Sequence, residues 1–277
     1  MSRAAPALRR PLPWIGHDDP WAVLVSEVML QQTQAARVVE PWAKFLSRFP
    51  TPADCAAASL ADVLREWSGL GFPRRARALH TAARQIRDDF GGQVPDQVDQ
   101  LRTLAGVGEY TANAVATFAF GRRVAVVDTN VGRILARAVA NRTLSVGEAR
   151  DLARRVLGGT DAARFNQAMI DLGALHCRAV PKCDQCPVRR VCRWHGEGGE
   201  DPAPKSGGVS RPQGRFKGSN RELRGVVLRE LREGPKEITQ LRQTLSFDDD
   251  ARLDIVLTSL VDDGLIFWGG DIGLIGD

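Results

Sequence analysis

Lysine is scarce in this 277-residue chain, and it is absent from residues 45–181. The lysines present are Lys44, Lys182, Lys205, Lys217 and Lys236. An enzyme that works through a Schiff base needs a lysine amine beside the reacting carbon. The long stretch without lysine therefore argues against Schiff-base chemistry in the main body of the chain and leaves arginine as its main source of positive charge.

Long apolar runs are also missing. No run reaches the ~20 residues that a membrane-spanning helix needs. Residues 1–13 are rich in Arg and Pro and lack the apolar stretch of an export signal. We expect a cytoplasmic protein with no membrane partner. Hydrophobic residues make up 43% of the chain, enough for a core in one large or two ordinary domains.

Positive charge is concentrated before residue 215. Residues 1–214 hold 29 basic and 21 acidic side chains, whereas residues 215–277 hold 9 basic and 12 acidic ones. A basic body favours a polyanionic partner, most commonly nucleic acid, although a solvated charged face gives the same balance. The negative net charge of residues 215–277 argues against strong independent binding of this acidic tail to DNA.

Helical patterns with short breaks fill residues 20–175, which predicts a mainly α fold. Helices are expected at 21–32, 74–90 and 110–120.

The C-terminal part has a different composition. Residues 195–219 are rich in Gly, Pro and Ser and predict a flexible linker. Three short helices and a hairpin turning at Gly269-Gly270-Asp271 then predict a winged-helix-like module that either packs, binds a partner or contacts DNA. These three helices are expected at 220–233, 238–245 and 251–263.

Four of the five cysteines lie within sixteen positions, as Cys177, Cys183, Cys186 and Cys192. In a reducing compartment such a group indicates metal ligation rather than disulfides. Four thiolates at this spacing fit a [4Fe-4S] cluster or zinc, and the spacing alone does not choose between them. Basic residues interleave with the cysteines, so the loop can also offer charge to phosphate.

A tight hairpin precedes a candidate catalytic carboxylate between residues 104 and 130. Gly106 and Gly108 are expected at positive φ, so that backbone N–H groups around Val107 and a helix N-terminus can meet a phosphate. A run rich in β-branched residues then leads to Asp128, which is expected to cap the next helix. A plain turn and a plain N-cap are the structural alternatives.

Glu27 lies in a helical segment, WAVLVSEVMLQQT, whose other residues are mostly apolar. A buried carboxylate is costly unless it is paired or protonated, so Glu27 is either half of a structural ion pair or a functional acid. With Asp128 it can form a pair with separated pKa values. Glycosidic cleavage uses such a pair, one acid for the leaving group and one anion for the oxocarbenium-like sugar.

Other polar candidates flank this pair. Tyr110 is the only tyrosine and follows the hairpin, where its hydroxyl can orient Glu27 or a water. Gln31 and Gln32 follow Glu27 on the same predicted helix and can probe a base stack. Their alternative is an ordinary place on the surface.

Five short motifs and the cysteine loop occur together in this chain. The motifs are SEVMLQQT (26–33), GLG (69–71), GVGEYTA (106–112), VDTNV (127–131) and FNQAM (165–169). Together they resemble the MutY-type A/G-specific adenine DNA glycosylases of the helix-hairpin-helix, or endonuclease III, superfamily. The resemblance covers about residues 12–194, and the tail resembles the short actinobacterial form.

The resemblance implies a mainly α helix-hairpin-helix glycosylase fold. Residues 20–125 would form a six-helix domain with the hairpin, and residues 1–19 and 126–194 would form an iron-sulfur cluster domain. The active cleft would lie between them. Residues 195–219 would be the flexible linker, and residues 220–277 the winged-helix-like module.

The resemblance also implies a monomeric, monofunctional enzyme on double-stranded DNA that contains a mismatch. It would flip out an adenine mispaired with guanine or 8-oxoguanine and hydrolyse its N-glycosidic bond. Glu27 would protonate N7 of adenine, and Asp128 would stabilise or transiently bond to the sugar cation. Tyr110 and Asn130 would support them, and the four cysteines would hold a [4Fe-4S] cluster. DNA-contacting positions would be Trp14, Leu30, Gln31, Gln32, Gly106, Val107, Gly108 and Gln167.

The chain departs from the family pattern in several places. Ile15 stands where an Arg usually follows Trp14, and Pro73 replaces a wedging aromatic, which leaves Phe72 as the nearest ring. The first cysteine gap has five residues instead of six, and the tail does not resemble the Nudix-like domain of the long form. Ile15 keeps open a glycosylase for mismatched thymine or uracil. A non-enzymatic iron-sulfur DNA-binding regulator and a lyase are further alternatives, which the acidic tail and the missing lysine oppose.

Overall fold

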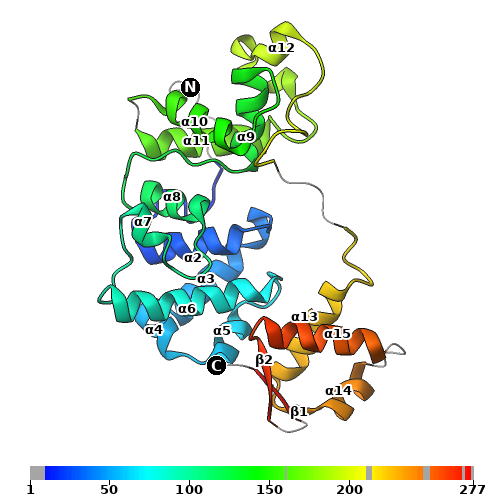
Figure 1. Ribbon diagram of the computed structural model, residues 1–277. Coiled ribbons are helices and arrows are strands. Elements are labelled where there is room, and N and C mark those ends of the chain that lie inside the picture. The colour runs from blue at the N-terminus through cyan, green and yellow to red at the C-terminus, as the bar shows by residue number, and fades with distance from the viewer. Residues whose placement is uncertain (1–9, 160, 210–213, 246–249, 270–271, 276–277) are drawn as a thin grey trace. The chain divides into compact units, whose positions relative to one another are not determined.

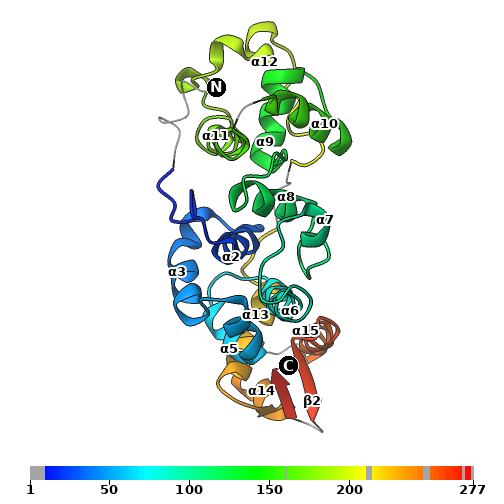
Figure 2. The ribbon, with the colours of Figure 1, turned by 90° about the vertical axis from the view of Figure 1, so that its left-hand side faces the viewer.

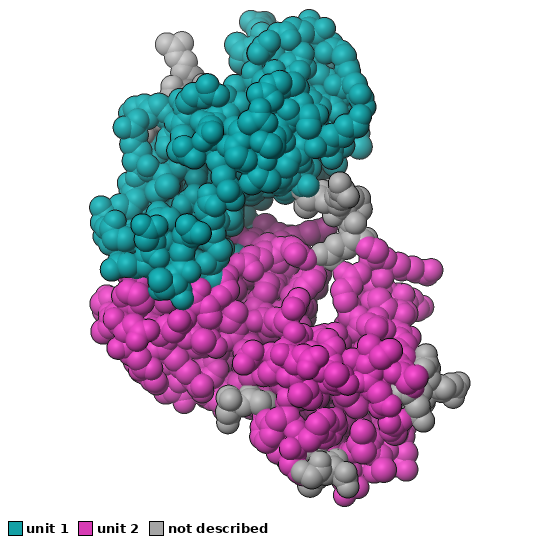
Figure 3. Space-filling model, viewed as in Figure 1, with its two compact units in different colours: residues 1–27, 96–103, 107–212 teal, residues 28–95, 104–106, 213–277 magenta. Residues whose placement is uncertain are grey.

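The computed structural model describes residues 10–159, 161–209, 214–245, 250–269 and 272–275. The chain is mainly helical, and it divides into two compact units (Figures 1 and 3). Unit 1 comprises residues 1–27, 96–103 and 107–212, and unit 2 comprises residues 28–95, 104–106 and 213–277. Among the described helices, none combines the length and apolar character that a membrane crossing requires.

Unit 1 is built from helices around one apolar core, which includes Val126, Leu135, Met169 and Leu172. Its elements are α7 (Val98–Leu101), α8 (Glu109–Phe118), α9 (Thr129–Ile134), the π-helical turn η2 (Leu135–Ala140), α10 (Val146–Leu157), α11 (Ala162–Leu175), the 3-10 turns η3 (Cys183–Gln185) and η4 (Arg189–Val191), and α12 (Arg193–Glu197). The helix predicted at 110–120 corresponds to α8. The run 124–127 belongs to no helix and pairs with no described strand.

Unit 2 contains a second set of helices, in which capping residues mark several helix starts. Thr51 and Ser59 accept backbone N–H groups at the starts of their helices. The elements before residue 96 are η1 (Ala35–Arg37), α3 (Val39–Arg48), α4 (Pro52–Ala57), α5 (Leu60–Glu66) and α6 (Pro73–Asp89). Helix α2 (Pro20–Leu30) begins in unit 1 and ends in unit 2.

The C-terminal part of unit 2 has the element order predicted for a winged-helix-like module (Figure 1). Its elements are α13 (Asn220–Arg232), β1 (Lys236–Glu237), α14 (Ile238–Leu245), α15 (Asp250–Asp262), β2 (Ile266–Gly269) and β3 (Ile272–Ile275). The antiparallel sheet has the order β1-β3-β2, with Ile266 opposite Ile275. Strand β1 was not predicted because two residues carry no readable alternation. The predicted turn residues Gly270 and Asp271 lie outside the described residues.

The first half of the segment predicted as a flexible linker is packed against unit 1. Ala203 is fully buried, and the Ser206 hydroxyl donates to Pro202 O and accepts the Leu144 N–H. Gly207 donates its N–H to Leu144 O at 2.7 Å, and a Cβ there would lie 2.6 Å from Val146 N. Residues 201–209 are therefore packed instead of forming an exposed linker, because Gly207 permits a close approach to Val146.

Candidate active site

Buried Glu27 contacts the partly buried Tyr110 in unit 1. Glu27 on α2 is 5% exposed, and its Oε2 is buried with no hydrogen-bond partner. The Tyr110 hydroxyl, from the first turn of α8, hydrogen-bonds the Glu27 carboxyl. Burial raises the pKa of Glu27 to about 7, the Tyr110 hydrogen bond opposes this shift, and the charge of Asp128 adds to it. Glu27 can therefore hold a proton near neutral pH.

Asp128 lies near the same group of side chains, and both of its carboxyl oxygens accept hydrogen bonds. It is the N-cap of α9, as predicted, and its Oδ1 accepts the Val131 N–H at 2.7 Å. Its Oδ2 accepts Asn130 Nδ2 at 2.5 Å. The pKa of Asp128 is raised overall by burial, and these hydrogen bonds and the charge of Arg133 oppose that shift. Asp128 thus has hydrogen-bond donors that favour its anion, whereas Glu27 Oε2 has none.

Arg133 joins this pair to the cysteine loop. Its Nη2 donates to Asn130 Oδ1 at 2.6 Å and to Gly173 O at 3.2 Å, and its Nε donates to Cys177 O at 2.7 Å. The Asn130 side chain therefore connects Asp128 to Arg133. The sequence carried no signal for Arg133, because its partners come from three separate segments.

Gly173 allows α11 to approach α9 at Asn130. A Cβ on Gly173 would lie 2.5 Å from Asn130 Cβ and 2.7 Å from Asn130 O. Real Cβ atoms do not approach backbone so closely, so a side chain here would displace Asn130. This role of Gly173 was not predicted, because a glycine within a helix carries no information about the distant segment that it contacts.

Two predicted DNA-contacting residues in unit 1 have internal environments. Gln167 Nε2 donates to Asp171 Oδ1 at 3.0 Å, an atom that also accepts Arg10 Nε at 2.6 Å. Trp14 is 8% exposed, and Ile15 is partly buried. Their contacts with DNA stay a prediction.

The predicted hairpin differs from expectation at its second glycine. Gly106 has φ +74°, as predicted, and a Cβ there would lie 2.7 Å from Ala78 Cβ. Gly108 has φ −82° and ψ 178°, so the prediction of positive φ is wrong. Gly108 is the N-cap of α8, a position that takes extended backbone. The Val107 side chain is buried, which leaves its backbone as the group available to a ligand.

Gln31 and Gln32 lie beyond α2 rather than on it, because the helix ends at Leu30. Arg75 accounts for this end. Its Nη1 donates to the carbonyls of Val28, Met29 and Gln31 at 3.0, 2.8 and 2.5 Å, which satisfies the free acceptors of the last turn.

The loop that follows α2 is also held from a second side. Gln32 has φ +57°, and Gln31 Nε2 donates to Gly106 O at 3.3 Å. The glutamines are thereby presented by an irregular loop in contact with the hairpin, and Leu30 is the last helical residue before it.

The four clustered cysteines line one cavity in unit 1, together with Arg137, His176 and Trp194. His176 Nδ1 is buried there with no hydrogen-bond partner. Among the described residues, no three Cys, His, Asp or Glu side chains are grouped so as to hold a single metal ion. A tetrahedral zinc ion draws its sulfur ligands to about 2.3 Å from one centre. Zinc and iron-sulfur clusters both take thiolate ligands, so the four thiols around this cavity are candidate ligands for either.

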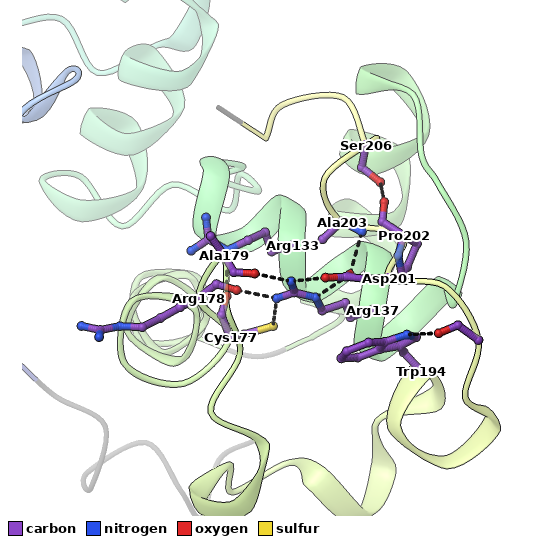
Figure 4. A network of polar contacts seen from close by, with 11 residues as sticks. Arg133, Arg137, Cys177, Arg178, Ala179, Trp194, Asp201, Pro202, Ala203 and Ser206 are labelled. Carbon is purple, nitrogen blue, oxygen red and sulfur yellow. Dashed lines mark hydrogen bonds and ion pairs between the residues drawn. The ribbon is translucent and has the colours of Figure 1, made fainter. Parts of the chain in front are cut away.

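Arg137 lines this cavity and hydrogen-bonds several groups around it (Figure 4). It is 1% exposed at the side chain, and it donates to Cys177 Sγ at 3.5 Å and Arg178 O at 2.6 Å. Asp201 receives two hydrogen bonds from it, at 2.8 and 2.6 Å. The Trp194 ring lies 5.4 Å from its guanidinium carbon. The packed segment after α12 therefore closes onto the cysteine loop through a buried, paired cation.

Comparisons with known proteins agree with this geometry. The family described as HhH-GPD superfamily base excision DNA repair protein matches residues 25–157. The chain is 42% identical to an adenine DNA glycosylase of Mycolicibacterium smegmatis over 93% of this chain and 88% of that protein. It is 40% identical to the human adenine DNA glycosylase over 67% of this chain and 37% of that protein.

Solved structures share the helical fold. A thermostable thymine-DNA glycosylase gives a TM-score of 0.63 at 29% identity, covering 68% of this chain and 90% of that chain. A trapped endonuclease III–DNA covalent intermediate gives 0.63 at 28% identity, covering 71% and 92%. With the buried acid, the capping aspartate, the hairpin and the cysteine loop described above, these matches show that the chain belongs to the adenine DNA glycosylases of the helix-hairpin-helix base-excision repair superfamily.

Proposed function

We propose that this DNA glycosylase releases adenine mispaired with guanine or 8-oxoguanine, acting as a monomer and without lyase activity. The observation that carries the proposal is the buried Glu27–Tyr110 contact beside a hydrogen-bonded Asp128. The same three residues stand in the motifs that resemble the adenine-specific family. The absence of lysine from residues 45–181 supports hydrolysis without a Schiff base.

The proposed reaction divides the work between the two carboxyl groups. Neutral Glu27 donates its proton to N7 of the flipped adenine as the bond between N9 and C1′ breaks and its electron pair moves to the base. Ionised Asp128, held by Val131 and Asn130, stabilises the positive charge left on the sugar. Water then adds at C1′ and gives a proton back to Glu27, with Tyr110 holding the carboxyl in place.

We propose that the four cysteines hold a [4Fe-4S] cluster. The cavity that the four thiols share supports a common ligand site, and the resemblance to the MutY-type family favours the cluster over zinc there. Such a cluster would brace the loop that carries basic residues towards DNA. The Cys177 carbonyl and Arg133 also connect that loop to Asn130.

The buried acid predicts a pH-dependent effect on stability. The Glu27 pKa is about 7 in the folded chain and 4.5 ordinarily, so the folded state binds more protons between these values. Stability therefore falls as the pH rises from 4.5 to about 7 and stays reduced above it. We expect Glu27→Gln to raise the thermal midpoint over the parent chain more at pH about 8.5 than at pH about 5. Calorimetry at both pH values measures this, and equal shifts would contradict the raised pKa.

The substrate assignment is tested by single-turnover assays on matched duplexes. Adenine would be placed opposite 8-oxoguanine, guanine or cytosine, and thymine or uracil opposite guanine. We expect abasic product from adenine opposite 8-oxoguanine and guanine, and no borohydride-trapped adduct. Faster release of thymine or uracil would instead assign the pocket to pyrimidines, which is the alternative that Ile15 keeps open.

A further inference from the structure

The C-terminal module, residues 220–277, contributes no residue to the chemistry proposed above. Its negative net charge argues against DNA binding by the module alone. Residues 220–277 hold seven Lys and Arg against twelve Asp and Glu. The exposed side chains among the described residues of α15 include no cation. Most of the module's cations have internal partners: Arg224 with Asp263, Lys236 with Glu230, Arg242 with Asp254 and Arg252 with Asn220.

The module is instead joined to the first turn of α6 through Asp263. The Asp263 carboxylate accepts hydrogen bonds from Arg224 of the module and, at 3.5 Å, from Arg74 Nη1 of α6. The Asp263 carbonyl accepts Arg77 Nη1 at 2.8 Å. Three guanidinium groups from two separate segments therefore converge on one aspartate.

Gly264 provides the space for this joint. It has φ +60°, and a Cβ there would lie 2.6 Å from Cζ and Nη2 of Arg77. The Arg77 guanidinium thus occupies the volume that any other residue would fill. The hydrogen bond from Arg77 to the Asp263 carbonyl holds this end of the side chain against Gly264.

A second contact joins the module to the end of α5. Arg232 Nη1 donates to Leu64 O at 3.0 Å, and Arg65 Nη2 donates to Arg232 O at 3.2 Å. Helix α13 also packs against α5 (Figures 1 and 2). The module therefore holds the end of one helix and the start of the next, on both sides of the turn 67–72.

This turn is strained and is tied to the loop after α2. Phe72 has φ +49° and ψ 62°, an unfavourable conformation for an aromatic residue. Arg75 lies over the Phe72 ring at 5.2 Å and donates to Leu70 O and Gly71 O at 3.2 Å. The same guanidinium holds the carbonyls of Met29 and Gln31. The first turn of α6, which carries Arg74, Arg75 and Arg77, thus connects Asp263 to the turn 67–72 and to the loop after α2.

We propose that the winged module is a positioning element. It holds the turn 67–72 and the loop after α2 in the geometry that they need to recognise the base opposite the flipped adenine. It acts through the Asp263 joint and not by contacting DNA. This inference rests on the proposed function and on the sequence-based prediction that Gln31 and Gln32 contact the base stack.

The test changes the joint from each side in the full-length chain. Asp263→Asn alters the module side, and the double change Arg74→Gln with Arg77→Gln alters the α6 side. Asp254→Asn is the matched control, since it removes the same charge from an ion pair internal to the module. The readouts are the dissociation constant for an uncleavable mismatch duplex and the ratio of single-turnover rates for adenine opposite 8-oxoguanine and opposite cytosine. Circular dichroism melting checks that each variant is folded.

We expect both joint variants to lose about tenfold in this ratio, with the control within about twofold of the parent chain. If Arg74 and Arg77 instead bound phosphate directly, Asp263→Asn would free them and tighten DNA binding, whereas the arginine changes would weaken it. Such opposite signs, or an unchanged ratio in folded variants, would overturn the inference. A parent chain that releases no adenine would instead overturn the proposed function.

Discussion

Glu27→Gln and Asp128→Asn are each expected to slow single-turnover release of adenine by about 10³-fold or more. Glutamine keeps the shape of Glu27 but has no carboxyl proton to donate to the base. Asparagine at position 128 can still cap α9 through its side-chain oxygen, but it carries no negative charge for the sugar cation. The loss should therefore fall on chemistry and not on folding.

Binding measurements separate these roles from a structural one. The dissociation constant for a mismatch duplex should change by less than about threefold in either variant, since neither side chain is proposed to bind the DNA backbone. Tyr110→Phe is a useful companion, because it removes the hydrogen bond to Glu27 and leaves the ring. It should reduce the rate far less than Glu27→Gln. Adenine release near the parent rate in the Glu27 or Asp128 variant would refute the assigned pair.

Gly173→Ala is expected to destabilise the protein by about 3 kcal/mol, although alanine is the better helix former. The new Cβ would lie 2.5–2.8 Å from Asn130 Cβ, O and C, so α9 must move. Because Asn130 donates to Asp128, adenine release should also slow in protein that is still folded. Thermal melting should show a midpoint lower by about 6–12 °C, and assays well below that midpoint measure the rate.

Gly225→Ala is the matched control for this change. Gly225 is also helical, on α13, but it is exposed and a Cβ there meets no atom within 4 Å. The same substitution should stabilise the chain by about 0.5–1 kcal/mol and leave the rate unchanged. If both glycine variants shifted the midpoint in the same direction, the steric explanation at Gly173 would be wrong.

Local patterns in the sequence were sufficient for much of the secondary structure. Helix α14 has the predicted bounds, and α8 and α13 differ from prediction by one or two residues at their ends. The buried Glu27, the cap at Asp128 and the positive φ of Gly106 also follow from residue type and immediate neighbours. These features depend on interactions within a few residues, which a linear pattern records.

Features that depend on distant segments could not be predicted in this way. The end of α2 at Leu30 is explained by Arg75, 45 residues later, whose guanidinium takes the helix carbonyls. The packed course of residues 201–209 depends on Arg137 and Leu144, although its composition indicates flexibility. Composition describes what a segment can do alone, and these partners lie far along the chain.

The sequence alone determined the mainly helical class, the order of most elements, the four clustered thiols and the two carboxylates proposed for catalysis, since residue type and spacing carry that information. Only the tertiary structure decided how the groups are supported: Arg133 and Gly173 at Asn130, Arg137 behind Cys177, and Asp263 against α6. The physical reason is that a buried hydrogen bond or a close backbone approach is a property of two segments together.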